Sequence, residues 1–276
     1  MGVLNTIRNY FEKRAVVLMY HRIAVPNSDP WELCVSPENF EQHLQILSKK
    51  KVVHLTQLVN KLQSNSIALT FDDGYLDNYT AARPLLEKYN MPATFFITTG
   101  QETEYWWDEL EQLFSDRTEY MEHWNTLFPL PHTRQQEILS PLRTSDHHPQ
   151  QQVCMDRTQL KDLASNPLFE LGVHTVTHAA LAHQSPATQL SEIVNARDWL
   201  QQLTGKQHGL LAYPYGNYDE TTINIASAQQ FNAAFTTEQK TMTGRSGRFR
   251  IGRFQVKNWD GKEFAERLEQ WLKNTK

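Results

Sequence analysis

Two adjacent carboxylates follow an apolar, β-prone stretch in the first third of the chain. The segment from Ile67 to Tyr75 reads I-A-L-T-F-D-D-G-Y, so a predicted buried strand ends at Asp72 and Asp73 and then turns at a glycine. Alone, this pattern is more often an ordinary Asp-Gly turn. Burying two neighbouring carboxylates is nevertheless costly unless a cation, a proton or hydrogen bonds compensate. The pair therefore predicts a source of positive charge from another part of the chain.

A pair of histidines in the second half of the chain could hold that charge. His174 and His178 follow the apolar run from Phe169 to Val173, and their spacing brings both imidazoles to one face if the chain is helical there. Two imidazole nitrogens and one carboxylate oxygen, with open positions, suit a catalytic divalent metal such as zinc. The histidine pair alone is a weak signal, because the chain contains 11 histidines. Combined with a strand-end Asp pair, it indicates a metal site.

Alternating strand and helix patterns would position these groups. Apolar runs predict strands at residues 15–20, 52–55, 67–71, 91–97, 169–173, 209–213, 231–236 and 250–256. Helical patterns lie between them, at residues 36–47, 56–63, 78–89, 158–164, 189–204, 221–230 and 261–273. This alternation, about seven or eight βα units, predicts parallel strands with helical crossovers. In a parallel α/β barrel the carboxyl ends of the strands meet at one rim, where the Asp pair and the histidines would share a site.

Two segments depart from the alternation. Residues 101–156 are interpreted as a helical insertion in one strand-to-helix connection, so that residues 1–276 form a single domain. In this insertion Trp106 is expected to pack in a core, whereas Trp107 either packs likewise or stacks on a sugar ring. Residues 1–14 predict a short amphipathic helix that closes one end of the barrel, a location we favour over contact with a membrane surface.

Composition excludes several classes of protein. The chain of 276 residues is 39% hydrophobic and 21% charged, as in soluble globular proteins, and its net charge of -4 gives no electrostatic case for a nucleic-acid partner. No segment approaches the roughly 18 apolar residues of a membrane span, and no signal peptide is recognised, so a cytoplasmic location is the default expectation. Cys34 and Cys154 form no cysteine-type zinc site, although one bridge between them is left open. The oligomeric state is not predicted.

Three motifs occur in the order and context of a known family. T-F-D-D-G spans residues 70–74, H-T-V-T-H spans 174–178 and A-Y-P-Y-G spans 212–216. From about Leu18 to Trp271 the chain resembles the polysaccharide deacetylases of carbohydrate esterase family 4, the NodB homology domain. L-M-Y-H-R at residues 18–22, P-A-T-F-F at 92–96 and Y-W-W-D-E-L at 105–110 resemble the branch of that family found among polysaccharide biosynthesis genes.

The resemblance implies a deformed (β/α)7-8 barrel that removes an acetyl group from an N-acetylated sugar with metal-activated water. Asp73, His174 and His178 would hold the divalent metal, for which zinc is favoured over cobalt, nickel or manganese. Asp72 would be the general base, and the backbone N–H of Tyr215 would help to stabilise the oxyanion. The expected partner is a saccharide, with a binding surface assigned to Tyr213, Pro214 and Trp107.

Two departures from the family pattern shape the remaining hypotheses. Ala212 stands where many members have an arginine that orients the catalytic Asp, and the late Leu-x-His motif has no counterpart in the last strand. We hypothesise that Arg253 replaces the missing charge and that His21 or a water acts as the acid. Two alternatives to an N-deacetylase stay open: a non-catalytic saccharide-binding or scaffold protein on the same fold, and an O-acetyl esterase.

Overall fold

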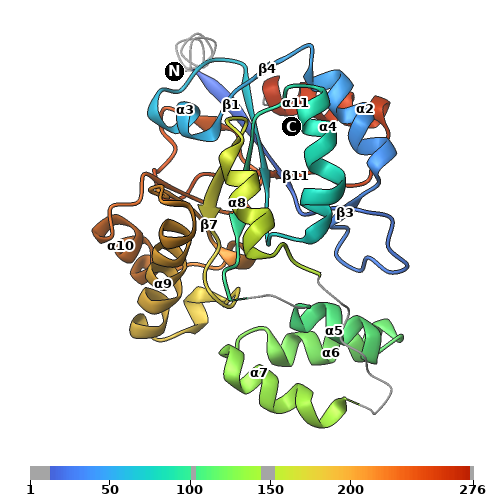
Figure 1. The fold of residues 1–276 in the computed structure, drawn as a ribbon, viewed down its shortest axis with the longest axis vertical. Helices are drawn as coiled ribbons and strands as arrows, with labels where there is room; N and C mark the ends of the chain where they lie inside the picture. Colours follow the sequence, from blue (N-terminus) through green and yellow to red (C-terminus); the bar gives the residue numbers. More distant parts are fainter. Residues whose placement is uncertain (1–12, 101–103, 144–152, 274–276) are drawn as a thin grey trace, which may run out of the picture.

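A curled, mostly parallel sheet lies at the centre of the molecule, with helices on its outside (Figure 1). This computed structural model describes residues 13–100, 104–143 and 153–273. The strands of the sheet are β1 (Arg14–Tyr20), β4 (Lys51–Val52), β5 (Ser66–Phe71), β6 (Ala93–Ile97), β7 (Phe169–Val173), β8 (Leu210–Ala212), β9 (Ala233–Phe235), β10 (Met242–Thr243) and β11 (Phe254–Gln255). Their main order is β10-β1-β5-β6-β7-β8-β9, with β4 also paired to β5.

Residues 251–255 lie in space between β9 and β1 and bring the two ends of the parallel sheet together. Ile251 forms a parallel bridge with Phe235 of β9, and Phe254 in β11 pairs in parallel with Leu18 of β1. Arg253 therefore lies between two contacts that close the sheet into a barrel. The predicted deformed (β/α) barrel is confirmed. The predicted last strand, residues 250–256, was too long, because only Phe254–Gln255 forms ladder pairs there.

Helices cover the outer face of the barrel, and their ends lie within about three residues of the predicted ones, although the predicted helix at residues 78–89 is divided into two. They are α2 (Pro37–Leu47), α3 (Leu55–Asn60), the π-helical turn η1 (Asn78–Ala82), α4 (Arg83–Lys88), α8 (Arg157–Ser165), α9 (Pro186–Thr204), α10 (Glu220–Ala228) and α11 (Gly261–Lys273). Ser36 caps α2 by accepting the N–H of Asn39 at 3.2 Å, and Pro37 occupies the first helical position. Gly205 ends α9 in the left-handed conformation, with φ of 69°.

Alternation along the strands separates an outer core from a barrel interior. On β5, Ile67, Leu69 and Phe71 pack under the helices, whereas Ala68 belongs to the interior cluster. Because successive side chains of a strand point to opposite faces, Thr70 and then Asp72 continue the interior row toward the carboxyl rim. The same alternation on β1 places Val17 inside the barrel, followed by Met19 and His21. Strand alternation thus places polar groups in the barrel interior at the carboxyl ends of the strands.

The insertion forms a separate group of helices beside the carboxyl ends of the strands (Figure 1). Its described helices are α5 (Trp106–Leu113), α6 (Arg117–Leu127), α7 (His132–Leu139) and the short η2 (Ser140–Leu142). They share a third hydrophobic cluster that includes Trp106, Trp107 and Leu110. Nothing in the described chain is a helix long and apolar enough to cross a membrane. The predicted helix at residues 1–14 lies almost entirely outside the described residues, as do parts of the insertion.

Several smaller features were not anticipated. β10 is a two-residue strand antiparallel to β1, and β2 (Arg22–Ile23) pairs in parallel with β3 (Cys34–Val35) within a segment predicted largely as loop. The two cysteines are both buried and free, so the structure does not contain the bridge that the sequence left open. Short strands of this kind lack the length that a hydrophobic period needs to be recognised.

Candidate active site

One carboxylate and two imidazoles meet at the carboxyl ends of β5 and β7. Oδ1 of Asp73 lies 3.3 Å from Nε2 of His174 and 3.2 Å from Nε2 of His178. All three side chains are buried, and their potential ligand atoms lie within 4.8 Å of one another. Residues about 100 positions apart in the chain therefore form one compact O,N,N set.

The donor set fits a divalent metal ion. Nδ1 of His174 lies 2.8 Å from the carbonyl oxygen of Ala212, and since a carbonyl only accepts, this nitrogen carries a proton. The other nitrogen, Nε2, then faces Oδ1 of Asp73, a buried atom without a hydrogen-bond partner. A proton or a cation between them must compensate the carboxylate. One oxygen and two imidazole nitrogens are ligands that zinc and its neighbours accept, with positions left open for water or substrate.

Electrostatics keep Asp73 ionised, as a metal ligand requires. Burial alone raises the pKa of a carboxyl group, but His178 and His174 outweigh this effect, and the pKa of Asp73 lies well below its ordinary value. For His178 the balance is different. Burial lowers the pKa of this imidazole, and the attraction of Asp73 does not fully restore it. For His174, burial lowers the pKa but Asp72 and Asp73 outweigh this effect and raise it, so a metal ion bound there would displace a proton from Nε2.

The H-T-V-T-H segment is not helical, so the two histidines do not share a helix face, as the sequence analysis had suggested. Thr175 and His178 both have positive φ, 66° and 57°, and the chain there is a turn after β7. Asp73 has a φ of 74° as well. Such angles are uncommon for residues other than glycine, and they cost free energy that the surroundings must supply. The two imidazoles therefore converge through a strained turn rather than through helical spacing.

Glu192 on α9 holds this turn in place. One carboxylate oxygen accepts the backbone N–H groups of Val176 and Thr177 at 2.9 and 2.8 Å, and the other accepts the Thr177 hydroxyl at 2.8 Å. The glutamate thus accepts hydrogen bonds from three donors that lie between the two histidines. Sequence reasoning missed it, because a glutamate within an amphipathic helix looks like part of a solvated face.

Asp72 points into the barrel and forms a two-point ion pair with Arg253. Nη1 and Nη2 of the guanidinium donate to Oδ1 and Oδ2 at 2.7 and 2.6 Å. Arg253 is fully buried and also donates to the hydroxyl of Thr70 and the carbonyl of Thr236, both at 3.1 Å. Burial raises the pKa of Asp72, but Arg253, together with His174 and His21, more than offsets this, so the net pKa is lowered. The ion pair fixes an ionised carboxylate next to Asp73, His174 and His178, the three candidate metal ligands (the metal set).

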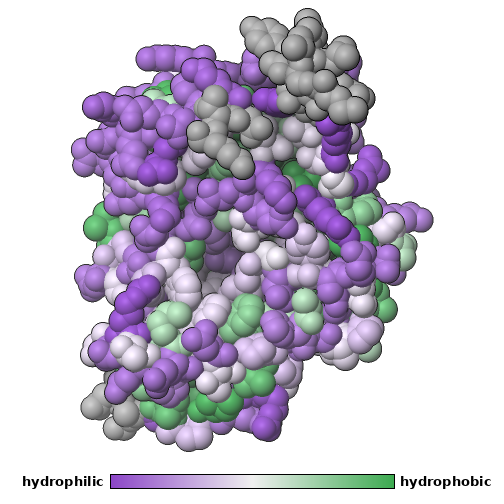
Figure 2. Space-filling view, turned by 180° about the vertical axis from the view of Figure 1, so that it is seen from behind, coloured by the Kyte–Doolittle hydropathy of each residue, from purple (hydrophilic) through white to green (hydrophobic). Residues whose placement is uncertain are grey.

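A cavity of about 290 Å³ opens over these groups. Its lining residues are Met19, His21, Trp31, Leu33, Asp72, Asp73, Trp107, Trp124, His174, His178, Tyr215, Thr237 and Gln255. On the face opposite to that of Figure 1, the surface is hollowed at the level where the barrel meets the insertion (Figure 2). The cavity combines a charged floor from the barrel with a largely aromatic wall.

Most of the predicted site residues line this cavity, but three do not: Arg253, which lies behind Asp72, and Tyr213 and Pro214. His21, Trp107 and Tyr215 lie in the lining, the last with a φ of 58°. Tyr213 does not. Its ring is fully buried, it stacks on Tyr218, and its hydroxyl donates to the carbonyl of Phe249 at 3.2 Å.

Pro214 is buried beside Tyr213 and is likewise absent from the lining. Neither side chain therefore lies on the surface of the cavity, and their assignment to a saccharide surface gains no support from the structure. Tyr213 is the first residue beyond β8 and packs outward under the helices, because strand alternation places Ala212 on the inner side. The sequence analysis also missed Trp31 and Trp124, which come from a loop and from α6 and have no motif to mark them.

Comparison with known proteins places this geometry in a family. The model of the polysaccharide deacetylase family matches residues 59–234. The putative polysaccharide deacetylase YxkH of Bacillus subtilis (strain 168) is 25% identical over 262 residues, covering 92% of this chain and 75% of its own. The poly-beta-1,6-N-acetyl-D-glucosamine N-deacetylase of Staphylococcus aureus (strain MSSA476) is 24% identical over 288 residues, covering 91% and 85%.

Solved structures share the fold. The deacetylase PplD of Streptococcus pyogenes, in complex with acetate, superimposes with a TM-score of 0.68 at 23% identity, over 95% of this chain and 99% of that one. IcaB from Ammonifex degensii gives a TM-score of 0.67 at 21% identity, over 94% and 97%. The family model covers more than half of the chain and includes all of the metal and base candidates, so the chain belongs to the polysaccharide deacetylase family.

Proposed function

We propose that this protein is a metal-dependent hydrolase that removes acetyl groups from an N-acetylated sugar of a polysaccharide or of its precursor. The observation that carries the proposal is the buried set of Asp73, His174 and His178 beside a separate, arginine-bound Asp72. Two adjacent carboxylates with different partners suit two roles, one as a ligand and one as a base. Membership of the polysaccharide deacetylase family supports the reaction class.

Asp73, His174 and His178 would hold a divalent ion, for which zinc is the first candidate. Bound there, such an ion would supply Lewis-acid chemistry, lowering the pKa of water from 15.7 to about 7. Asp72 would accept the proton of the attacking water, and Arg253 would keep that carboxylate oriented and ionised before the reaction. Asp72 has two oxygens, so it can hold the guanidinium and still accept a further hydrogen bond.

Tyr215 and His21 complete the proposed reaction path. The backbone N–H of Tyr215 would donate to the oxyanion that forms on the acetyl carbonyl. His21 lines the same cavity and would deliver a proton to the departing amine, directly or through a water. Burial lowers the pKa of His21, and the nearby carboxylates partly oppose this effect. Because the lowered pKa leaves His21 mostly neutral near pH 7, the proton that it delivers would be the one that Asp72 takes from the attacking water, passed on to His21 before the amine departs.

The choice of an N-acetylated sugar rests on relatives and on the shape of the site. Staphylococcal relatives bear the name poly-beta-1,6-N-acetyl-D-glucosamine N-deacetylase. The aromatic wall of the cavity suits the apolar faces of sugar rings, while the charged floor suits a single amide group. An O-acetyl ester would meet the same residues, so the substrate itself must distinguish the two reactions.

Acetate release tests this proposal. The protein is incubated with oligosaccharides of β-1,6-linked N-acetylglucosamine, after removal of bound metal and after addition of zinc or cobalt. We expect acetate release with metal and none without it. No release with any metal, from a protein that still binds the oligosaccharide, would indicate a non-catalytic saccharide-binding protein instead. Release only from O-acetylated sugars would indicate an esterase.

A further inference from the structure

The segment Y-W-W-D at the start of α5 is bonded directly to the turn that carries the Asp pair. The Tyr105 hydroxyl donates to the carbonyl oxygen of Asp73 at 2.6 Å. Nε1 of Trp107 donates to the hydroxyl oxygen of Tyr75 at 2.9 Å, and that hydroxyl donates in turn to the Asp108 carboxylate at 3.1 and 3.2 Å. The first described turn of the insertion is thus joined to residues 73–75 by a chain of hydrogen bonds.

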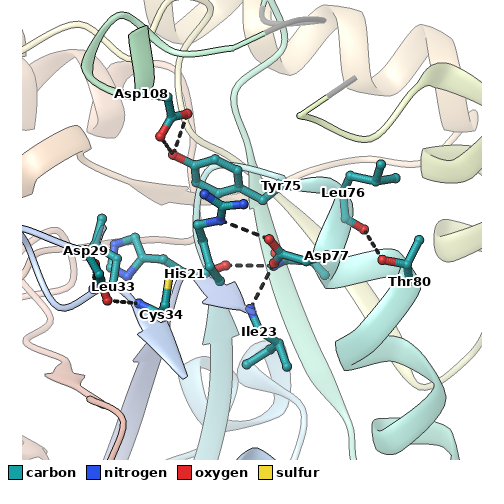
Figure 3. Close-up of polar contacts among 12 residues, drawn as sticks. His21, Ile23, Asp29, Leu33, Cys34, Tyr75, Leu76, Asp77, Thr80 and Asp108 are labelled. Carbon is teal, nitrogen blue, oxygen red and sulfur yellow. Dashed lines mark hydrogen bonds and ion pairs between the residues drawn. The ribbon is translucent and has the colours of Figure 1, made fainter. Parts of the chain in front are cut away.

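Tyr75 is the central residue of this chain, and its orientation is fixed. Figure 3 shows its hydroxyl pointing to Asp108, on the side away from Asp77. The guanidinium of Arg22 lies over its ring at 4.5 Å and is itself paired with Asp77 at 2.9 Å. Tyr75 is fully buried. Trp107 is buried as well, whereas Asp108 is partly exposed, so breaking the bond between Trp107 and Tyr75 leaves a buried N–H without water to replace it.

The consequence of this anchoring is the position of Trp107. Its ring centroid lies 4.6 Å from that of His178 and 5.9 Å from that of Tyr215, and its indole forms part of the cavity lining. The neighbouring Trp106 is different, since it packs within the insertion and is absent from the lining. Of the two adjacent tryptophans, the one held by Tyr75 is therefore the one that faces the site.

The insertion supplies the wall of the cavity, and the barrel supplies its floor. Trp124 of α6 joins Trp107 in the lining, and Trp31 packs against Trp124 with ring centroids 4.7 Å apart. These aromatic surfaces carry no group that could act on an acetyl bond. They do offer flat apolar faces of the kind on which sugar rings stack.

We propose that the insertion determines the affinity for saccharide, with Trp107 as the stacking surface and Tyr75 and Asp108 as the positioning residues that hold it over the metal set. This inference rests on the proposed deacetylase function, whose chemistry it leaves to the barrel. In this arrangement the Y-W-W-D segment couples the saccharide wall to the strand end that carries Asp72 and Asp73.

The test separates KM from kcat on two substrates. Trp107→Leu and Tyr75→Phe are compared with the wild-type holoenzyme on a β-1,6-linked N-acetylglucosamine oligosaccharide and on 4-nitrophenyl acetate, which has no sugar. We expect KM for the oligosaccharide to rise about tenfold in Trp107→Leu and about fivefold in Tyr75→Phe. With 4-nitrophenyl acetate, kcat/KM should fall by clearly less than with the oligosaccharide in both variants, and bound zinc should be unchanged.

Tyr79→Phe is the matched control, because Tyr79 also donates its hydroxyl to an aspartate, Asp162 at 2.5 Å, but on the outside of the barrel. It should change neither constant. Unchanged KM in both test variants would overturn the inference, and so would an equal loss on both substrates accompanied by loss of zinc. If the wild type releases no acetate, the deacetylase proposal is contradicted. The inference about Trp107 and Tyr75 can still be tested in that case, by measuring oligosaccharide binding to the same variants by calorimetry. Equal binding by all of them would refute it.

Discussion

The barrel and the insertion contribute to one cavity with different kinds of side chain. From the barrel come the ionisable groups, Asp72, Asp73, His174 and His178, each placed by the end of a buried strand. From the insertion come the rings of Trp107 and Trp124, and Trp107 is held over that floor by its hydrogen bond to Tyr75. A parallel barrel fixes Asp72, Asp73 and His174 to within narrow limits, because each follows directly on a strand with neighbours on both sides, whereas His178 depends on the turn after β7. Helices added at the rim can then vary the saccharide surface while the floor stays the same.

If the barrel alone performs the chemistry, Asp72→Asn should have the largest effect on rate. Loss of a general base typically costs about 10²- to 10⁴-fold in kcat. We expect a decrease of this size in acetate release, with KM for the saccharide close to wild type. A variant that retains full turnover would mean that another group accepts the proton, and that the two carboxylates do not divide their roles as proposed.

Removing the partner of Asp72 should reduce both stability and rate. Arg253→Ala leaves a buried carboxylate without its guanidinium, and breaking a buried pair in this way typically costs about 3–5 kcal/mol in free energy of unfolding. Chemical denaturation would measure that loss, and acetate release would measure the accompanying decrease in kcat. Arg253→Lys should recover only part of either, because lysine cannot make the two-point contact. Equal behaviour of the alanine and lysine variants would contradict a role in orienting Asp72.

Glu192 tests whether the strained histidine turn depends on its support from α9. Glu192→Ala removes the acceptor of three hydrogen bonds, and loss of such supporting contacts typically weakens metal binding about 10- to 100-fold. Competition with a zinc chelator would measure the affinity. Glu192→Gln can still accept hydrogen bonds and should recover much of it. Full affinity in the alanine variant would show that the turn holds its shape without Glu192.

The smallest expected effect is on the pH dependence of stability, through Asp108, which joins the insertion to Tyr75. Burial raises the pKa of Asp108 to about 7, although Arg22 and Tyr75 oppose the shift. Since the folded-state pKa is above the unfolded one, the folded state binds the proton more tightly, and stability falls as pH rises from about 4 to 7. Asp108→Asn has no such titration. The difference in Tm between variant and wild type should therefore favour the variant more at pH 8 than at pH 5.

An identical difference at the two pH values would mean that Asp108 titrates normally. Glu111 also has a pKa raised to about 7, by burial first and by Asp108 next, so Asp108→Asn changes its titration too. Both proteins should therefore also carry Glu111→Gln, and the comparison then isolates the aspartate that contacts Tyr75.

The sequence predicted the floor of the cavity better than its wall, for physical reasons. A buried strand ending in polar residues leaves a clear pattern, and Asp72, Asp73 and Arg253 all lie on or next to such strands. The turn that joins His174 to His178 left none, because its shape depends on Glu192 from a distant helix. Strand alternation, applied one residue further, would have placed Tyr213 outside the barrel rather than in the cavity.

The wall could be predicted only in part, because its residues meet through tertiary contacts. Trp107 was recognised as one of two tryptophans with competing interpretations, and nothing in the local sequence separates it from Trp106. The distinction comes from Tyr75, which is 32 residues away. Trp31 and Trp124 are brought together from a loop and from α6, and neither segment has a periodic pattern that points to the other.

The most direct test of the account is the metal content of three proteins after loading with zinc and dialysis against metal-free buffer. The claim is that one carboxylate of the pair binds metal while its neighbour acts as the base. Wild type and Asp72→Asn should each retain about one ion per chain, and Asp73→Ala should retain almost none. Zinc loss in Asp72→Asn equal to that in Asp73→Ala, or full retention in Asp73→Ala, would contradict the claim.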